Sequence, residues 1–507
     1  MKHIILVALS VFVLIFFSSV SINSFADIDP RGDAQGAHDL DITTFKKQLE
    51  AMEETIRKQQ EMINGLKVKI ETKEKVAEIS NPTNMEENEI EQVIDNYLMK
   101  KETKKKMADA GLTRSPYSLQ AFWDKGLRFE SENGNFKFKL GGRMYNDWGW
   151  LKEDKDVLEG IGDQVDGTLF RAVRLYTSGE IYENIGYKVS YDFGSGGGRP
   201  SFADVYMELK KIPVLGNFRV GHFKEPFSLE ELTSSRFVTF MERSVNNAFS
   251  PKRNTGFMLY NNLLDKRMTW AAGVFRNADV FGDSQGDRST EGGYSFSGRI
   301  TGLPYYEDKG KKLIHTGFSY AYKNAFENEF SFDSHPEIRL ADDFVDTGSF
   351  KADLANLINP ELAIVYGPFS LQTEYTFADI NRKRSTTGSN VFTGFYVYGS
   401  YFLTGEHRKY ETKKGAFGRV KPNKNFNWGK GMGALELTAR YSELDLSDRD
   451  IDGGKLDDVT LGINWYLNPN TRVMLNYVRA KVDRLVSSVR LDDAKADLLS
   501  MRFQIDF

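Results

Sequence analysis

The stretch SMRFQIDF, residues 500–507, alternates apolar and polar side chains up to the last residue of the chain. In an extended strand Met501, Phe503, Ile505 and Phe507 lie on one face, and the polar residues between them lie on the other. Chain ends usually fray, so an amphipathic strand at this position needs a structural reason. Pairing with the first strand of a closed barrel supplies that reason, because unpaired backbone groups at a sheet edge cost several kcal/mol in lipid.

The composition also favours strands with one apolar and one polar face. The 37 Phe, 23 Tyr and 44 Gly are many for a soluble enzyme of 507 residues, yet the mean hydropathy is -0.46. The absence of cysteine excludes disulfides, thiolate metal sites and cysteine nucleophiles, and the six histidines form no HExxH cluster. We therefore expect no cofactor, although the composition leaves an all-carboxylate metal site open. A formal net charge of -4 identifies no partner, and we expect no nucleic-acid binding.

Residues 1–26 have the pattern of a secretory signal peptide. Lys2 precedes the apolar run 4–17, and small residues then lead to Ser-Phe-Ala. The run is shorter than the roughly 20 residues that a membrane-spanning helix needs, and an uncleaved anchor helix is the alternative. A secreted chain without cysteine and with many aromatic strands indicates a bacterial envelope protein.

Residues 27–80 are predicted to form a coiled-coil stalk. An unbroken heptad runs from Ile42 to Ile70, and its two seam positions are apolar except at Gln59. This length favours self-association over a single amphipathic helix on a globular domain, but it does not separate a dimer from a trimer. Residues 81–132 follow as a second helix and linker, whose lysine-rich run is either a solvated helix end or a contact for anionic cell-wall polymer.

Residues 133–507 are predicted to form an all-β transmembrane barrel of sixteen antiparallel strands. Period-two alternation recurs in sixteen segments, and the connections after even-numbered segments are mostly tight, as at Glu183-Asn184. Connections after odd-numbered segments are mostly long, above all 225–253 and 324–360, and the long stretch 405–431 is the exception to the rule. The strands of a soluble β-sandwich also alternate apolar and polar side chains, so alternation alone does not identify a barrel. Short turns on one rim, long loops on the other and an even strand count favour the barrel.

The first predicted barrel strand, NFKFKLGGRMYNDWGW (residues 135–150), separates cations from apolar residues. Lys137, Lys139 and Arg143 share one parity, and Phe138 is among the apolar residues of the other parity. A cation on the lipid-facing side costs roughly 2–4 kcal/mol at the bilayer midplane. The three cations are therefore expected to line the lumen.

The next predicted strand, TLFRAVRLYTSGE (residues 168–180), places Leu169 outward and Phe170 and Arg174 inward. Arg171 has lipid-side parity, so we expect it near a rim or at a subunit contact. Later strands add both signs to the polar faces, and the balance at the narrowest point therefore decides selectivity. These later polar-face residues are Lys188, Arg219, Lys323, Asp192, Asp204, Glu208, Glu361 and Glu374.

The connection 225–253 is the candidate constriction loop. Ser228 and Glu231 form a capping-box pattern, which predicts a short helix within it. Arg236 and Arg243 offer guanidinium groups that bind phosphate in bidentate fashion. Internal salt bridges that hold the loop down are the alternative role for each of these residues.

Six stretches in consistent order over roughly residues 120–507 together resemble the phosphate-selective porins O and P of bacterial outer membranes. The resemblance implies a trimer of sixteen-stranded barrels that conducts phosphate or polyphosphate past arginine and lysine side chains. The stretch 405–431 is also similar to a feature of that family. The stretches are FKFKLGGRMYNDWG, LFRAVRLY, SSRFVTFMER, YFLTGEHRKY with GAFGRVKP, ALELTARYSELDL, and TLGINWYLNPNTRVMLNYVRAK.

The resemblance carries over to individual residues with one departure. Arg143 stands where the family has a pore-lining arginine after Gly-Gly, and Arg236 and Arg243 fit its constriction-loop pattern. Arg171 matches the first of two adjacent arginines, but alanine holds the second place. Arg174 has the parity of that alanine and is the candidate to replace the missing charge.

The leading hypothesis is a passive channel for small anions, phosphate first, in the bacterial outer membrane with its stalk in the periplasm. The alternatives are a general-diffusion porin and a trimeric structural barrel that tethers the outer membrane to the cell wall. Outer-membrane lipid, a homotrimer and a cell-wall contact are the expected partners. We expect no enzyme, because no Ser/His/Asp arrangement in the sequence favours one.

Overall fold

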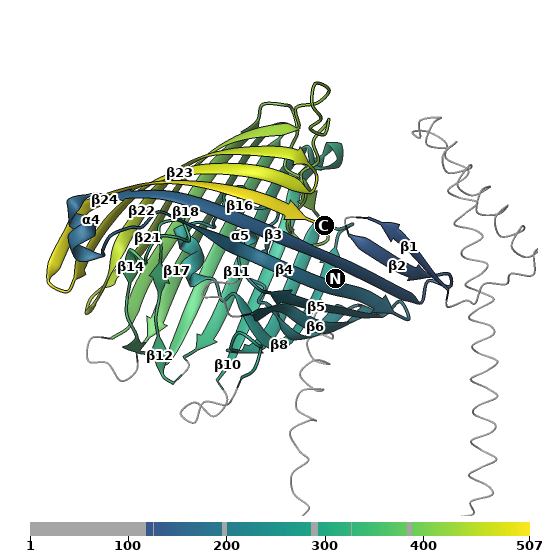
Figure 1. Cartoon of the computed structure of the whole chain (residues 1–507). Helices are drawn as coiled ribbons and strands as arrows, with labels where there is room; N and C mark the ends of the chain where they lie inside the picture. The colour runs from purple at the N-terminus through teal and green to yellow at the C-terminus, as the bar shows by residue number, and fades with distance from the viewer. Residues whose placement is uncertain (1–117, 125, 195–199, 285–292, 326, 383–387) are drawn as a thin grey trace, which may run out of the picture. The chain divides into compact units, whose positions relative to one another are not determined.

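The computed structural model describes residues 118–507 apart from 125, 195–199, 285–292, 326 and 383–387 (Figure 1). The predicted signal peptide, coiled-coil stalk and second helix lie outside the described residues. Within the described part of the chain, no helix is long and apolar enough to cross a membrane. Most described residues belong to antiparallel strands.

The large sheet has 18 strands, of which two form a hairpin at its edge and sixteen close into a barrel. The last strand, β24, pairs with the first, β3, from Ala496 opposite Glu153 to Asp506 opposite Arg143 (Figure 1). The predicted strand number and the predicted closure by the C-terminal strand are confirmed. The barrel strands are β3 (Phe136–Glu153), β4 (Gly167–Ile181), β5 (Ile185–Asp192), β6 (Ser201–Ile212), β7 (Gly216–Lys224), β8 (Arg253–Leu263), β9 (Met268–Arg276), β10 (Tyr294–Glu307), β11 (Lys312–Asn324), β16 (Leu354–Tyr366), β17 (Phe369–Asn381), β18 (Asn390–Phe402), β21 (Ala434–Asp448), β22 (Ile451–Asn468), β23 (Thr471–Val486) and β24 (Val489–Asp506).

Short elements occupy the connections between these strands. Ser228 caps the helix α5 by accepting from the backbone N–H of Glu231 at 3.1 Å, so the predicted short helix of the 225–253 connection is present. The short elements are α4 (Lys155–Gly160), α5 (Leu229–Leu232), η1 (Val245–Phe249), η2 (Asp308–Gly310), β12 (Glu329–Phe330), β13 (Asp333–Ser334), β14 (Val345–Asp346), β15 (Phe350–Lys351), β19 (Tyr410–Glu411) and β20 (Ala416–Phe417).

The alternation predicted for β3 is observed. Phe138, Leu140, Met144 and Trp148 are 38–45% exposed on the outer face, whereas Arg143 on the inner face is 9% exposed. An apolar outer face suits contact with lipid, because each cation there would cost roughly 2–4 kcal/mol.

β4 departs from the predicted alternation because it contains a β-bulge at Arg171. Tyr145 of β3 lies opposite Ala172, and the next residue, Asn146, lies opposite Phe170. Arg171 is therefore an extra residue without a partner in the register. A bulge of this kind inserts one residue into the strand, so the side chains on one side of it point to the opposite face of the sheet from the face that strict alternation predicts.

The bulge overturns three predicted orientations. Arg171 turns inward, where its Nε donates to Glu242 Oε1 at 2.7 Å, so its predicted lipid-side parity is wrong. Phe170, predicted to face the lumen, is 54% exposed on the outer surface. Leu169, predicted to face outward, lies opposite the buried Asp147 and lines an internal cavity with it.

A hairpin at residues 119–131 extends the sheet beyond the ring. Its strands β1 (Leu119–Trp123) and β2 (Leu127–Ser131) lie in the stretch that the sequence analysis assigned to a linker. β2 pairs with residues 137–140 of β3, whereas β24 pairs with β3 from Arg143 onward. The hairpin therefore covers the edge of β3 that lies beyond the end of β24.

Three connections fold into the barrel. Residues 225–252 and 325–353 follow odd-numbered barrel strands and enter from one rim, and residues 403–433 enter from the opposite rim. The first of them crosses to the far wall, where the carbonyl of Met241 accepts from Arg502 of β24 at 2.5 Å. The connections thus divide the lumen into a covered side and an open side.

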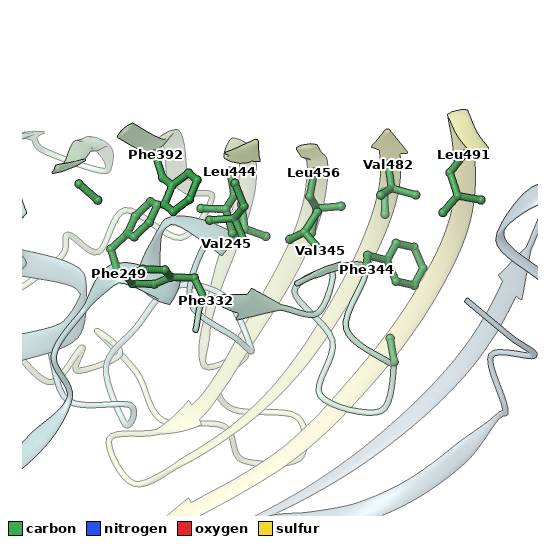
Figure 2. Close-up of a cluster of buried hydrophobic side chains, with 14 of the residues drawn as sticks. Val245, Phe249, Phe332, Phe344, Val345, Phe392, Leu444, Leu456, Val482 and Leu491 are labelled. Carbon is green, nitrogen blue, oxygen red and sulfur yellow. The ribbon is translucent and has the colours of Figure 1, made fainter. Parts of the chain in front are cut away.

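The largest apolar core lies between the 325–353 connection and the inner wall of the barrel (Figure 2). Phe344 and Val345 of this connection face apolar side chains from neighbouring strands in Figure 2. Full burial of such a side chain is worth roughly 1.5–3 kcal/mol, so the cluster holds the connection against the wall. The facing strand residues are Phe392, Leu444, Leu456, Val482 and Leu491.

Candidate functional site

Partly exposed basic side chains gather on the inner wall of β3 to β8 and on the 225–252 connection opposite it. The side chains of Arg174, Lys188, Arg236 and Arg253 are 16–27% exposed. The side chain of Arg440, beneath the connections on the covered wall, is 1% exposed. Water therefore reaches the basic wall, and this wall is the candidate pathway for solutes.

Arg143 is a cation of this wall that forms no ion pair with a carboxylate among the described residues. It lies opposite Arg174 in the pairing of β3 with β4, and its Nη1 donates to Ser235 Oγ of the 225–252 connection at 2.8 Å. Its Nε is buried and has no hydrogen-bond partner. A buried donor without a partner costs about 1–3 kcal/mol. The missing ion pair leaves the positive charge of Arg143 without a directly paired carboxylate, so this charge can attract an anion.

Tyr176 gathers three more cations beside Arg143. Lys139 of β3, Lys188 of β5 and Arg236 of the 225–252 connection each lie 5.7 Å from the centre of its ring. A cation over an aromatic face gains roughly 0.5–1 kcal/mol when exposed and more when desolvated. The ring therefore holds like charges close together on the open side of the lumen.

Three carboxylates on this side of the lumen are each shared between two cations. One carboxylate then holds two basic side chains in place and still leaves a net positive charge. The ion pairs join Asp204 to Lys188 (2.5 Å) and Arg253 (2.8 Å), Glu231 to Lys224 (2.6 Å) and Arg243 (3.2 Å), and Asp506 to Arg236 (3.7 Å) and Arg419.

Two acidic residues of the 225–252 connection, Glu231 and Glu242, are ionised and hold the connection in place. Burial acts to raise the pKa of Glu231, but Arg243 and Lys224 bring it down to about 2. Burial likewise opposes ionisation of Glu242, yet its pKa lies well below the usual range because of Arg171 and Arg502. Both carboxylates therefore carry their charge at neutral pH and pin the connection to the wall.

The seven basic residues predicted to line a pore fall into two groups. Lys139, Arg143, Arg174 and Arg236 come together around Tyr176 and Ser235. Lys137, Arg171 and Arg243 form ion pairs with Glu180 at 3.4 Å, Glu242 at 2.7 Å and Glu231 at 3.2 Å respectively. Arg243 thus forms the internal salt bridge that was the alternative to an anion contact, and Arg236 forms one as well, with Asp506 at 3.7 Å.

Two members of the cluster were not selected from the sequence. Lys188 had the parity of a lumen residue, and Arg253 stood at the end of the constriction loop, yet neither entered the predicted site. Their common partner Asp204 lies on β6. In sequence order, this strand stands between β5, which carries Lys188, and β8, which carries Arg253. Parity was the available signal for Lys188, whereas the meeting of the three side chains depends on the tertiary structure.

Two of the acidic residues that made the sign of the lumen ambiguous, Glu361 and Glu374, lie on the covered wall. Glu361 and Glu374 are 4% and 1% exposed. Glu361 pairs with Arg299 at 2.6 Å, and Glu374 accepts the backbone N–H groups of Leu229 and Glu230 at 2.9 and 2.7 Å. Glu374 therefore anchors the 225–252 connection, and neither carboxylate faces the open side.

A closed antiparallel barrel of sixteen strands with an apolar outer face and an in-folded connection defines a porin of the bacterial outer membrane. Residues 138–507 match the family model described as phosphate-selective porin O and P, and the chain belongs to this family. The protein is thus a channel and not an enzyme.

The individual proteins that match the chain are distantly related to it, with sequence identities below 30%. The chain is 26% identical to Porin O of Pseudomonas aeruginosa over 420 residues, which cover 75% of this chain and 90% of that protein. It is 28% identical over 371 residues to an uncharacterized protein of Caulobacter vibrioides, with 70% of each chain covered. Among solved structures, it is similar to an anion-selective porin from Comamonas acidovorans, at 13% identity and a TM-score of 0.47 over 73% of this chain and 100% of that one. It is also similar to the channel DcaP of Acinetobacter baumannii, at 14% identity and a TM-score of 0.47 over 75% of this chain and 99% of that one.

Proposed function

We propose that the protein is a passive channel for small anions, with phosphate or polyphosphate as its preferred solute. The observation that carries the proposal is Arg143, which forms no ion pair with a carboxylate among the described residues and lies beside Arg174. Lys139 and Arg236 add charge within the same cluster. A phosphate oxygen accepts strong charge-assisted hydrogen bonds from such groups, and a guanidinium matches two of its oxygens at once.

The family and the sign of the open wall support the same conclusion. The family model carries phosphate selectivity in its description, and the relative from Pseudomonas aeruginosa is named Porin O. Asp204 on the open side is shared by Lys188 and Arg253, and Arg143 has no ion pair among the described residues, so a permeating anion meets net positive charge along this wall.

The test is the zero-current potential of the purified protein in planar bilayers across a chloride gradient, repeated with phosphate. We expect a potential close to that of an anion-selective pore, and block of the chloride current by low concentrations of phosphate. Cation preference would refute the anion channel. Anion preference without block would support a general-diffusion porin instead of a phosphate channel.

We further propose that the barrel forms a homotrimer whose N-terminal stalk lies in the periplasm and contacts the cell wall. The unbroken heptad at residues 42–70 supports this proposal, because it favours self-association. Deletion of residues 42–107 should weaken the envelope and leave the single-channel conductance intact. An envelope of normal strength in the deletion strain would refute the tether.

A further inference from the structure

The hairpin β1–β2 continues the outer face of the barrel beyond the closed ring. Trp123 lies opposite Leu127, and Leu127 in turn lies opposite Leu140 of β3. Two residues further along β2, Phe129 lies opposite Phe138 of β3, and the centres of the two rings are 5.9 Å apart. Residues directly opposite each other in antiparallel strands point to the same face. The apolar side chains of the hairpin therefore share a face with the lipid-facing residues of β3.

This face is exposed and apolar, and the reverse face is polar except for Phe122, which lies opposite Arg128 and is 44% exposed. Leu119 and Trp123 of β1 are 60% and 63% exposed. On the reverse face Gln120 lies opposite Glu130, and Arg128 forms an ion pair with Asp124 at 3.1 Å. Large exposed apolar side chains on one face of an amphipathic element indicate a contact with another molecule or with lipid.

The position along β3 places the hairpin at a membrane boundary. The outward-facing apolar residues of β3 run from Phe136 to Trp150, which spans about 36 Å along the barrel axis at roughly 3.4 Å per residue and a strand tilt of about 40°. This is longer than the roughly 25 Å of the apolar band of outer-membrane barrels, so the aromatic residues at the two ends of the run lie in the interfacial girdles that flank the band. Phe138 therefore stands at the edge of the band, on the rim of the short turns. Phe129 beside it lies where amphipathic rings meet lipid headgroups.

We propose that the β1–β2 hairpin is a membrane anchor whose apolar face inserts into the headgroup layer of the phospholipid leaflet on the short-turn side. Lipid is the occupant because the face is continuous with the lipid-facing surface of β3 and lies at the level of its boundary. The aromatic ring of Trp123 suits this layer, which accepts an apolar body and a polar N–H together. The anchor holds the hairpin flat against the edge of β3 that β24 leaves uncovered.

The absence of cysteine from the chain allows a direct test by single-cysteine labelling. Full-length Leu119→Cys and Trp123→Cys proteins would carry an environment-sensitive fluorophore on the apolar face, and Leu119→Cys retains the Trp123 ring. Gln120→Cys reports the reverse face, and Val214→Cys reports the aqueous side of the same rim, because Val214 is 92% exposed in the turn between β6 and β7. Each protein is reconstituted in phosphatidylcholine vesicles with and without lipid that carries a spin label near the headgroup.

The expected result is loss of most of the emission at positions 119 and 123 by spin-labelled lipid, with little quenching by iodide. The labels at 120 and 214 should show the reverse pattern. Quenching by iodide at all four positions would overturn the anchor. Protection of 119 and 123 from both quenchers, with a disulfide between copies of the unlabelled Trp123→Cys protein, would also overturn it and would assign the face to a second copy of the chain.

Discussion

Replacement of Arg143 by glutamine removes one positive charge from the open wall and exposes no carboxylate, since no ion pair of Arg143 is found among the described residues. The hydrogen bond to Ser235 is worth about 1 kcal/mol, so the variant barrel should fold. A hydrogen bond between a charged group and phosphate contributes about 1.5–3 kcal/mol. Because about 1.4 kcal/mol corresponds to a tenfold change in affinity, phosphate should bind roughly 10- to 100-fold more weakly.

The assay is the phosphate concentration that halves the chloride current through single channels in planar bilayers. The control is Arg479→Gln, which removes an exposed arginine that pairs with Asp497 at 3.1 Å on the outside of the barrel. We expect the control to keep the wild-type value, because its charge does not face the lumen. If Arg143→Gln also keeps the wild-type value, Arg143 is not a phosphate ligand and the reasoning from its missing ion pair is wrong.

Three further substitutions test the remaining features of the site. Arg174→Gln leaves Asp192, its partner at 2.5 Å, without an ion pair, so it should lower anion preference more than Arg143→Gln does. Addition of Asp192→Asn should restore part of the zero-current potential. No recovery would contradict the ion-pair account. Glu242→Gln leaves the inward Arg171 without its ion pair, which should cost about 3–5 kcal/mol of folding free energy. The melting temperature should fall and the open-channel noise should rise. An unchanged melting curve would contradict the role of Glu242 in holding the connection against the wall. Glu231→Gln should lower the melting temperature at pH 7, and the gap to the wild type should close as the pH falls from about 4.5 to about 2, because the pKa of Glu231 is depressed and its stabilising charge is lost in that window. A gap that persists at pH 2 would contradict this assignment.

The shared carboxylates explain how the wall can hold many cations without losing its charge. Asp204, for example, fixes both Lys188 and Arg253, so neither side chain has to reorganise when an anion arrives. Cation–π contacts with Tyr176 likewise hold the side chains of Lys139 and Arg236 in place. Preorganised charge of this kind favours passage of anions with little cost in side-chain entropy.

Sequence reasoning predicted the fold more completely than the site. Strand number, closure and the outward parity of Phe138 follow from a period of two and from the cost of charge in lipid, which act locally along the chain. Arg171 was misplaced because a β-bulge inserts one residue, and nothing in an alternating pattern marks its position. The hairpin at residues 119–131 was missed because it is short and lies outside the repeated turn pattern.

The sequence by itself determined that this chain builds a sixteen-stranded barrel with basic residues inside, because each strand must satisfy the membrane on one face and water on the other. The tertiary structure decided which charges a solute can meet. The 225–252 connection covers Glu374, and the 403–433 connection covers the Arg299 and His315 partners of Glu361. Both carboxylates are buried, whereas Arg174, Lys188 and Arg253 stay partly exposed. That division arises from contacts between residues far apart in the chain, such as Arg502 with Glu242, which no local pattern contains.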